Sequence, residues 1–88
     1  MLQPEYSTSF KRDYKKIKKQ NKDMGLMRGI MNDLVEEKPL PPKNKDHSLT
    51  GNYIGYRACH IQPDWILIYK TNGNMIVFSR TGSHSEVY

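Results

Sequence analysis

The chain has a single cysteine and no long apolar run. Cys59 cannot form a disulfide within the chain, so the cysteine content fits a reducing compartment. No apolar stretch approaches the ~20 residues that a membrane-spanning helix requires. The first residues also lack the basic and then apolar pattern of a signal peptide. We therefore expect a soluble, cytoplasmic protein without a membrane partner.

The length of the chain limits the number of domains it can form. The 88 residues suffice for one core, so residues 1–88 are expected to form a single domain. The net positive charge lies in its first half: residues 1–45 hold 11 Lys and Arg against 6 Asp and Glu, whereas residues 46–88 hold 3 of each. This uneven charge indicates a polyanionic or acidic protein partner, or else simply a solvated basic helix face.

Two helices are expected after a short first strand. The strand covers residues 2–6, at an edge because Pro4 lacks an amide donor. The first helix follows the N-cap candidates at residues 7–9, and its apolar stripe is Phe10, Tyr14 and Ile17. Its outer face is basic and comprises Lys11, Arg12, Lys15, Lys16, Lys18, Lys19 and Lys22.

The second helix is expected over residues 24–37, with Asp23 as its N-cap and with methionine and leucine on its apolar face. The short joint makes the helices an antiparallel hairpin. Residues 39–42 are rich in proline and end the helix, and a polar surface loop extends from there to residue 52.

Three strands follow, over residues 53–61, 65–70 and 75–80. The second is almost continuously apolar and therefore central. Asn72-Gly73 predicts a type I′ hairpin turn, and the two short connections make the three strands an antiparallel meander. Ile76, Phe78 and Arg80 are expected on one face of the last strand. The fold class is α+β, a helical hairpin packed on a small antiparallel sheet in the order β-α-α-β-β-β.

All three histidines lie in the second half of the chain, and this meander brings polar residues to one edge of the sheet. The end of the first strand, the start of the second and the end of the third meet there, which places together His60, Asp64, Trp65, Arg80 and His84. His47 lies in the preceding loop. Histidine exchanges protons near neutral pH, so such a cluster suits acid–base chemistry on a phosphate. A chance scatter of polar residues at loop edges is the alternative.

Three motifs carry a resemblance to a known family. They are D-H-x-L-x-G at residues 46–51, H-x-x-P-D-W at residues 60–65 and R-x-G-x-H at residues 80–84. With this spacing the chain resembles the YafQ-type toxins of the RelE/ParE superfamily of type II toxin–antitoxin systems. The likeness is strongest over residues 45–88 and looser in the basic helix. It implies a two-layer RelE-like fold and a ribosome-dependent mRNA endonuclease that needs neither metal nor cofactor.

The resemblance also assigns residues and partners. The catalytic residues of the family match His47, His60, Asp64 and His84, and Arg80 and Trp65 fall in the same site. Tyr88 matches a terminal aromatic that is often phenylalanine. The implied partners are the 70S ribosome with its mRNA and a DinJ- or RelB-like ribbon-helix-helix antitoxin. Operator DNA would be contacted only through the antitoxin. The basic helix would face ribosomal RNA or the antitoxin.

Roles can be proposed from the chemistry of RNA cleavage, in which the 2′-hydroxyl attacks the adjacent phosphorus. His84 is the candidate acid, and Asp64 the candidate base with His47 or His60 as rivals, because a carboxylate with a pKa near 4 is a weak base at neutral pH. Arg80 could neutralise the phosphate or only form a salt bridge with Asp64. Trp65 and Tyr88 could stack on bases, although Trp65 could equally be core.

A metal site and a non-catalytic function are the remaining alternatives. The spacing of the histidines matches no zinc motif, so no metal is expected. A binding module that acts on an antitoxin, DNA or gyrase would use the same fold without chemistry.

Overall fold

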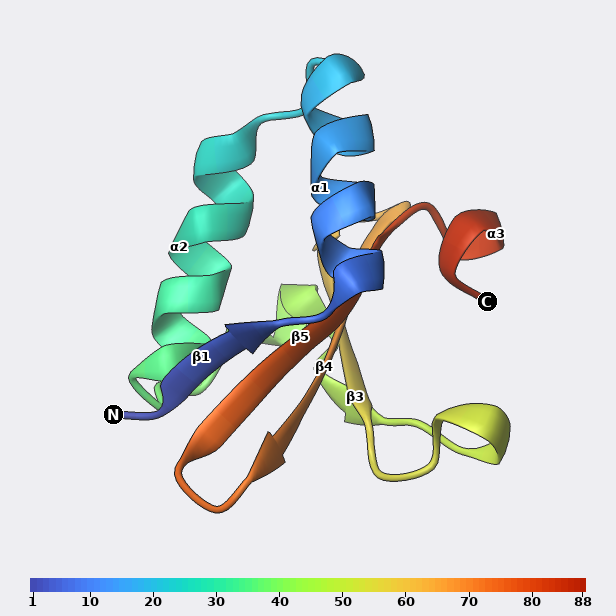
Figure 1. The fold of residues 1–88 in the computed structure, drawn as a ribbon. Coiled ribbons are helices and arrows are strands. Elements are labelled where there is room, and N and C mark those ends of the chain that lie inside the picture. Colours follow the sequence, from blue (N-terminus) through green and yellow to red (C-terminus); the bar gives the residue numbers. More distant parts are fainter.

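The computed structural model describes residues 1–88 and is built on a five-stranded sheet (Figure 1). The strands are β1 (Gln3–Tyr6), β2 (His47–Ser48), β3 (Arg57–Gln62), β4 (Trp65–Asn72) and β5 (Met75–Gly82), in the spatial order β1-β5-β4-β3-β2. The predicted meander β3-β4-β5 is present, with β4 at its centre. β1 is at the edge as Pro4 predicts, but it runs parallel to β5. The sheet is therefore mixed and not wholly antiparallel, because the two helices carry the chain across before it returns.

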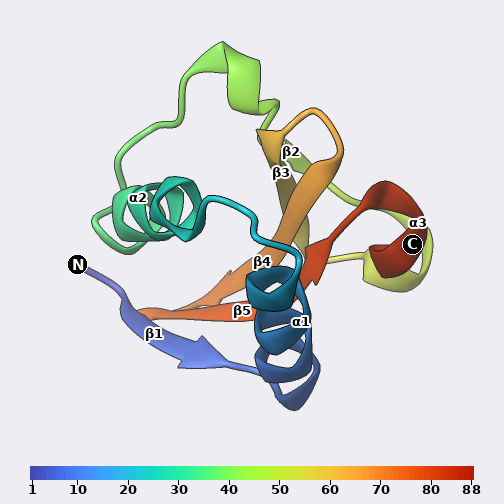
Figure 2. The ribbon, with the colours of Figure 1, turned by 90° about the horizontal axis from the view of Figure 1, so that it is seen from above.

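Two helices of twelve residues cover one face of the sheet. In α1 (Thr8–Lys19) the hydroxyl of Ser7 accepts a hydrogen bond from the amide of Phe10, and in α2 (Met24–Val35) the carboxylate of Asp23 caps the amide of Gly25. The helices form the expected antiparallel hairpin (Figures 1 and 2). α2 ends two residues before the predicted boundary. None of the helices has the length and apolar character needed to cross a membrane.

The main core lies between this hairpin and the sheet. Phe10 and Ile17 of α1 and Met27 and Leu34 of α2 are buried against the helix-facing side chains of the strands, among them Trp65, Leu67, Tyr69, Ile76 and Phe78. Burial of this apolar surface is what stabilises a domain of this size.

The opposite face of the sheet carries a second, smaller cluster. It consists of Ala58, Ile66, Ile68 and Val87, the last from the short helix α3 (His84–Val87). Seen from above, α3 lies on the side of the sheet away from α1 and α2 (Figure 2). Leu49, Tyr53 and Tyr56 pack against the same cluster. We refer to this side of the sheet, which faces away from the helical hairpin, as the open face.

Three local predictions need correction. The turn between β4 and β5 is centred on Gly73-Asn74, one residue later than predicted. Only Gly73 has a positive φ, of 59°, as in a type II′ turn. The polar loop contains two short 3₁₀ helices (Pro42–Asn44 and Gly51–Tyr53) and the strand β2.

The third correction concerns the faces of β5. Phe78 pairs with Tyr69 but Arg80 pairs with Ile68, so Ser79 is an extra residue in a β-bulge. Arg80 therefore lies on the open face, whereas alternation alone predicts the face of Phe78.

Candidate functional site

The strand register places two of the three histidines on the open face. His60 pairs with Ile66 across β3 and β4, and His47 pairs with Ala58 across β2 and β3. Because directly opposed residues point to the same side of a sheet, both histidines lie beside the small apolar cluster of that face. The strand β2, which the sequence did not predict, is thus what attaches His47 to the sheet.

The turn between β3 and β4 contributes the carboxylate. Asp64 Oδ1 accepts a hydrogen bond of 2.9 Å from the backbone amide of His84, the first residue of α3. In the same turn the carbonyl of Pro63 lies 3.1 Å from His60 Nδ1. These contacts gather His60, Asp64 and His84 at one corner of the sheet, as the meander predicts.

The hydrogen-bond partners of two imidazoles fix which nitrogen is protonated. His60 Nδ1 contacts the Pro63 carbonyl, and His47 Nδ1 contacts the Lys45 carbonyl at 2.6 Å. A carbonyl oxygen only accepts, so each Nδ1 must donate its hydrogen. In the neutral form of either ring, Nε2 then carries the free lone pair and can take up a proton.

His84 is oriented differently from the other two histidines. Its imidazole lies against the ring of Tyr88, with centroids 4.8 Å apart and planes at 56°. Tyr88 also contacts Tyr53 edge-on, and its ring remains about half exposed. The aromatic ring of Tyr88 is thus accessible from solvent beside a candidate catalytic group.

α3 is held by contacts from three other parts of the chain. The Tyr53 hydroxyl donates to the Val87 carbonyl (2.8 Å), and the Arg80 guanidinium donates to the Glu86 carbonyl (3.1 Å). The Glu86 carboxylate accepts from the Ser83 amide in a capping box and forms an ion pair with Lys16 of α1. The hydrogen bonds with Lys16 and Ser83 lower the pKa of Glu86 to about 2.

Arg80 has a partner other than the one the sequence suggests. Its Nε and Nη2 donate to the carboxylate of Asp13 at 2.6 and 3.3 Å, and the same carboxylate accepts from the amide of Thr81 at 3.1 Å. This contact with Asp13 raises the pKa of Arg80. The alternative of a salt bridge with Asp64 is not found, because the carboxylate of Asp13 holds the guanidinium. Its hydrogen bonds within the chain make Arg80 a link between α1, β5 and α3.

Trp65 belongs to the core. Its side chain is 1% exposed, its indole Nε1 donates to Thr81 Oγ1 at 2.9 Å, and Lys22 Nζ lies 5.6 Å from its ring. The expectation that Trp65 stacks on a base is therefore replaced by the alternative of a core side chain, since helix-facing residues of β4 point under the helical hairpin.

The basic residues of the first helix do not form one uniform surface. Lys11, Lys15 and Lys18, with Arg28 of α2, surround an apolar groove of about 650 Å³ between the helices. Lys16 is bound to Glu86, and Lys22, beyond the end of α1, faces Trp65. Arg12 and Lys16 lie instead beside Asp13 and Arg80, and Lys19 is exposed.

Sequence reasoning missed several residues that hold the site together. Asp13 anchors Arg80, and Tyr53 anchors α3. Next to His47, Asp46 accepts hydrogen bonds from the Tyr69 hydroxyl (2.7 Å) and from Arg57 Nε (3.2 Å). Asp13 did carry a signal, since it is the only acid in a long basic stretch. Nothing in the local sequence distinguishes Tyr53.

Comparisons with known proteins find relatives that match almost the whole chain. Residues 2–88 match the family described as the bacterial toxin YafQ of type II toxin–antitoxin systems. The mRNA interferase toxin YafQ of Escherichia coli K12 is 42% identical over 85 residues, which are 96% of this chain and 92% of that protein.

Solved structures are similar over the whole chain. The toxin chain in the E. coli DinJ–YafQ complex has 40% identity and a TM-score of 0.93, with 100% of this chain and 99% of that chain covered. A metal-bound toxin from Helicobacter pylori has 39% identity and a TM-score of 0.94, with both chains fully covered. The chain belongs to the YafQ family of bacterial toxins of type II toxin–antitoxin systems.

Proposed function

We propose that the chain is an mRNA endonuclease that acts on translating ribosomes and is neutralised by a cognate antitoxin. The E. coli relative bears the name mRNA interferase toxin. The observation that carries the proposal is the contact between Asp64 and the His84 amide, which ties the tail to the turn next to His60. Proton donors and acceptors from three separate segments thus lie around one exposed corner of the open face.

RNA cleavage by the 2′-hydroxyl needs a base, an acid and stabilisation of the phosphorane. The 2′-oxygen bonds to phosphorus while the 5′-oxygen leaves, so one proton is removed and another delivered. His84 is the proposed acid. Its imidazole is exposed at the start of α3, and as an imidazolium it can protonate the leaving oxygen.

The base is proposed to be a histidine of the open face. His60 and His47 each donate through Nδ1 to a carbonyl, which leaves Nε2 to accept the proton of the 2′-hydroxyl. Asp64 is then a positioning residue that holds the backbone of His84. Tyr88 is proposed to stack on an unpaired base, because its ring is half exposed beside His84.

Arg80 is proposed to position α3 and not to bind the phosphate directly. Its guanidinium already donates to Asp13 and to the Glu86 carbonyl. Positive charge for the phosphorane would then come from the imidazolium groups of the site.

The proposed chemistry is independent of metal. The H. pylori relative is metal-bound, but no group of three or more His, Cys, Asp or Glu side chains in this chain is placed to hold a metal ion. The donors present therefore do not fit a resident metal site. Toxin that has been treated with EDTA and then freed of it should cleave mRNA on ribosomes at the same rate as untreated toxin.

The antitoxin is proposed to bind the groove between α1 and α2. The E. coli relative was crystallised with DinJ. The groove has an apolar floor that includes Phe10 and Met27 and a rim of Lys11, Lys15, Lys18 and Arg28, so it suits an acidic, amphipathic segment. The partner is proposed to be a ribbon-helix-helix protein, and in the complex only this partner would contact operator DNA.

Cleavage of mRNA on purified translating ribosomes tests the function. His84→Gln should reduce the rate by 10²–10⁴-fold with an unchanged melting temperature, whereas Asn32→Ala on the exposed side of α2 should leave it unaltered. Lys15→Glu should weaken antitoxin binding and spare cleavage. Absence of cleavage by the wild-type protein would favour a non-catalytic binding module.

A further inference from the structure

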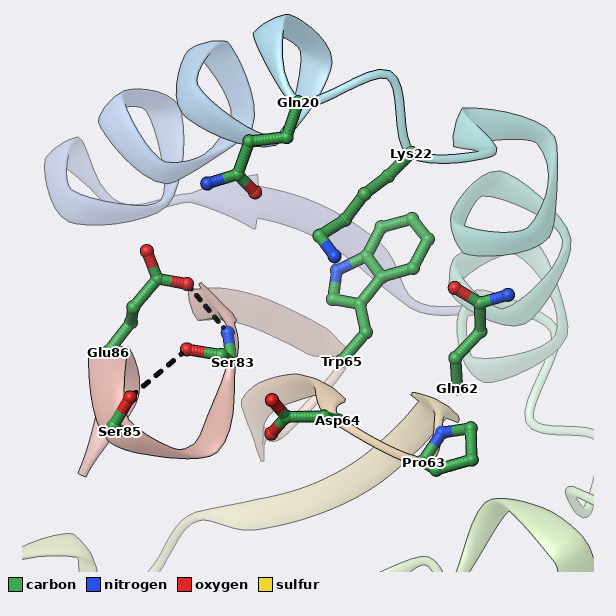
Figure 3. Close-up of a pocket in the computed structure, with 9 residues that line it drawn as sticks. All are labelled: Gln20, Lys22, Gln62, Pro63, Asp64, Trp65, Ser83, Ser85 and Glu86. Carbon is green, nitrogen blue, oxygen red and sulfur yellow. Dashed lines mark hydrogen bonds between the residues drawn. The ribbon is translucent and has the colours of Figure 1, made fainter.

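A polar cavity adjoins the candidate catalytic corner. It has a volume of about 800 Å³ and lies between the end of α1, the turn after β3 and the start of α3 (Figure 3). Its lining side chains come from the helix joint, the β3–β4 turn and the tail, and its only large apolar one is Trp65. Asp64 belongs both to this cavity and to the contact with His84.

Two of the side chains around this cavity make no hydrogen bond within the chain, and a third makes only a cation–π contact with Trp65. The carboxamides of Gln20 and Gln62 make no intramolecular hydrogen bond, and the Lys22 ammonium forms no ion pair. Gln20 and Lys22 approach from the helix side and Gln62 from the end of β3 (Figure 3). Each carboxamide offers one acceptor and two donor hydrogens. A ligand would thus find both donors and acceptors on opposite walls.

The charges of the cavity do not favour a phosphate and suit a neutral planar group. Asp64, Glu86 and Lys22 line it, and Lys16 neutralises Glu86. The lining therefore has no excess of positive charge to favour a phosphate, whereas an amino group of a nucleobase would meet carboxylate and carboxamide acceptors. Carboxamides and carboxylates are the side chains that recognise adenine, cytosine and guanine by their exocyclic amino groups. Uracil has no such group.

We propose that this cavity binds the nucleobase next to the scissile phosphate and favours a base with an exocyclic amino group. The inference rests on the proposed endonuclease function and assigns base selection to Gln20 and Gln62. Asp64 lines this cavity and also binds the His84 amide, so the cavity adjoins the proposed site of cleavage. The scissile phosphate itself would lie on the open face beside His60 and His84.

The test maps the 5′ ends of transcripts cut by the wild-type protein, by Gln20→Met and by Gln62→Met. Methionine keeps the length of the side chain and removes its hydrogen bonds. In each variant the preference for adenine, cytosine and guanine over uracil at one position flanking the cut should fall roughly tenfold. Gln3→Met, on the exposed strand β1, is the matched control and should cut with the wild-type preference.

A binding experiment without ribosomes tests whether the cavity binds the base of the messenger directly. Short oligoribonucleotides with a 2′-deoxy substitution at the cut site cannot be cleaved. Their titration should shift the NMR signals of both carboxamides, and should do so less when uracil occupies the flanking position. Wild-type cleavage with the same base preference in both variants would overturn the inference and leave the endonuclease function intact. The inference would also be overturned if the antitoxin, and not the oligoribonucleotides, shifted the NMR signals of the two carboxamides. Absence of any cleavage by the wild-type protein would instead refute the endonuclease function.

Discussion

Asp13 and Arg80, 67 residues apart in the chain, form a two-pronged ion pair that joins the first helix to the last strand. The same carboxylate also accepts from the amide of Thr81. Arg80 in turn binds the Glu86 carbonyl, so a single acid supports the segment that carries His84. The pair is partly buried, and its side chains are 15% and 29% exposed for Asp13 and Arg80.

Asp13→Ala is therefore expected to lower both stability and activity. Removal of one partner leaves the guanidinium and an amide without an acceptor, which costs about 2 kcal/mol. For a domain of this size the melting temperature should fall by roughly 10 °C. Urea unfolding measures the change. Asp13→Asn, which retains an oxygen acceptor, should lose less, and equal losses in both variants would contradict the assigned contacts.

Two substitutions of Asp64 distinguish an anchor from a base. Asparagine can still accept the hydrogen bond of the His84 amide, whereas alanine cannot. If Asp64 positions the tail, Asp64→Asn should keep cleavage within about tenfold of wild type and Asp64→Ala should lose roughly 100-fold or more. Single-turnover cleavage rates on ribosomes measure the difference. Equally severe losses would make Asp64 the base.

Glu86 gives the stability a dependence on pH in the acid range. The Lys16 ion pair and the Ser83 contacts lower its pKa to about 2 in the folded protein, against about 4.3 in an unfolded chain. The contribution is present above the unfolded value and is lost as the pH falls from about 4.5 toward 2. Because Lys16 is largely exposed, solvent screens the pair and the contribution should not exceed about 1 kcal/mol.

Glu86→Gln should accordingly destabilise the protein at pH 6, and the difference from wild type should shrink as the pH approaches 3. Urea midpoints across this range provide the measurement. Glu5→Gln on β1 removes one negative charge without touching an ion pair and is the control. A difference that is constant with pH would rule out the ion pair as its cause.

Trp65→Phe separates packing from RNA contact. The substitution removes the hydrogen bond to Thr81 and part of a buried ring, so it should cost about 2 kcal/mol. Because the ring is covered, cleavage below the melting temperature should stay within about threefold of wild type. Loss of activity by orders of magnitude at unchanged stability would show that the indole reaches the substrate.

The layers of the fold could be predicted from local patterns, and the details that position the site could not. The spacing of Phe10, Tyr14 and Ile17, the Asp23 cap and the apolar run of β4 each determine an element by short-range physics. The same patterns place His60, Asp64 and His84 at one corner, because two tight turns allow no other meander. The roles of these residues remain predictions.

The differences arise where one residue changes the register or where partners are distant in sequence. A bulge at Ser79 moves Arg80 to the other face, and nothing in the residues around it signals that extra position. The contacts of Asp13 with Arg80 and of Tyr53 with Val87 join segments far apart, so no local pattern contains them. The side of β4 on which Trp65 points does follow from alternation, and the helical hairpin above it decides that the ring is covered.

The helix α3 has only four residues, which is too short to be stable by itself. Its order depends on contacts with α1, the Gly51–Tyr53 turn and the β3–β4 turn. Transient detachment of this tail therefore requires much less free energy than unfolding of the sheet. Its amides should exchange with deuterium well before those of β4. Each detachment would carry His84, the proposed acid, away from the β3–β4 turn while the rest of the domain stays folded.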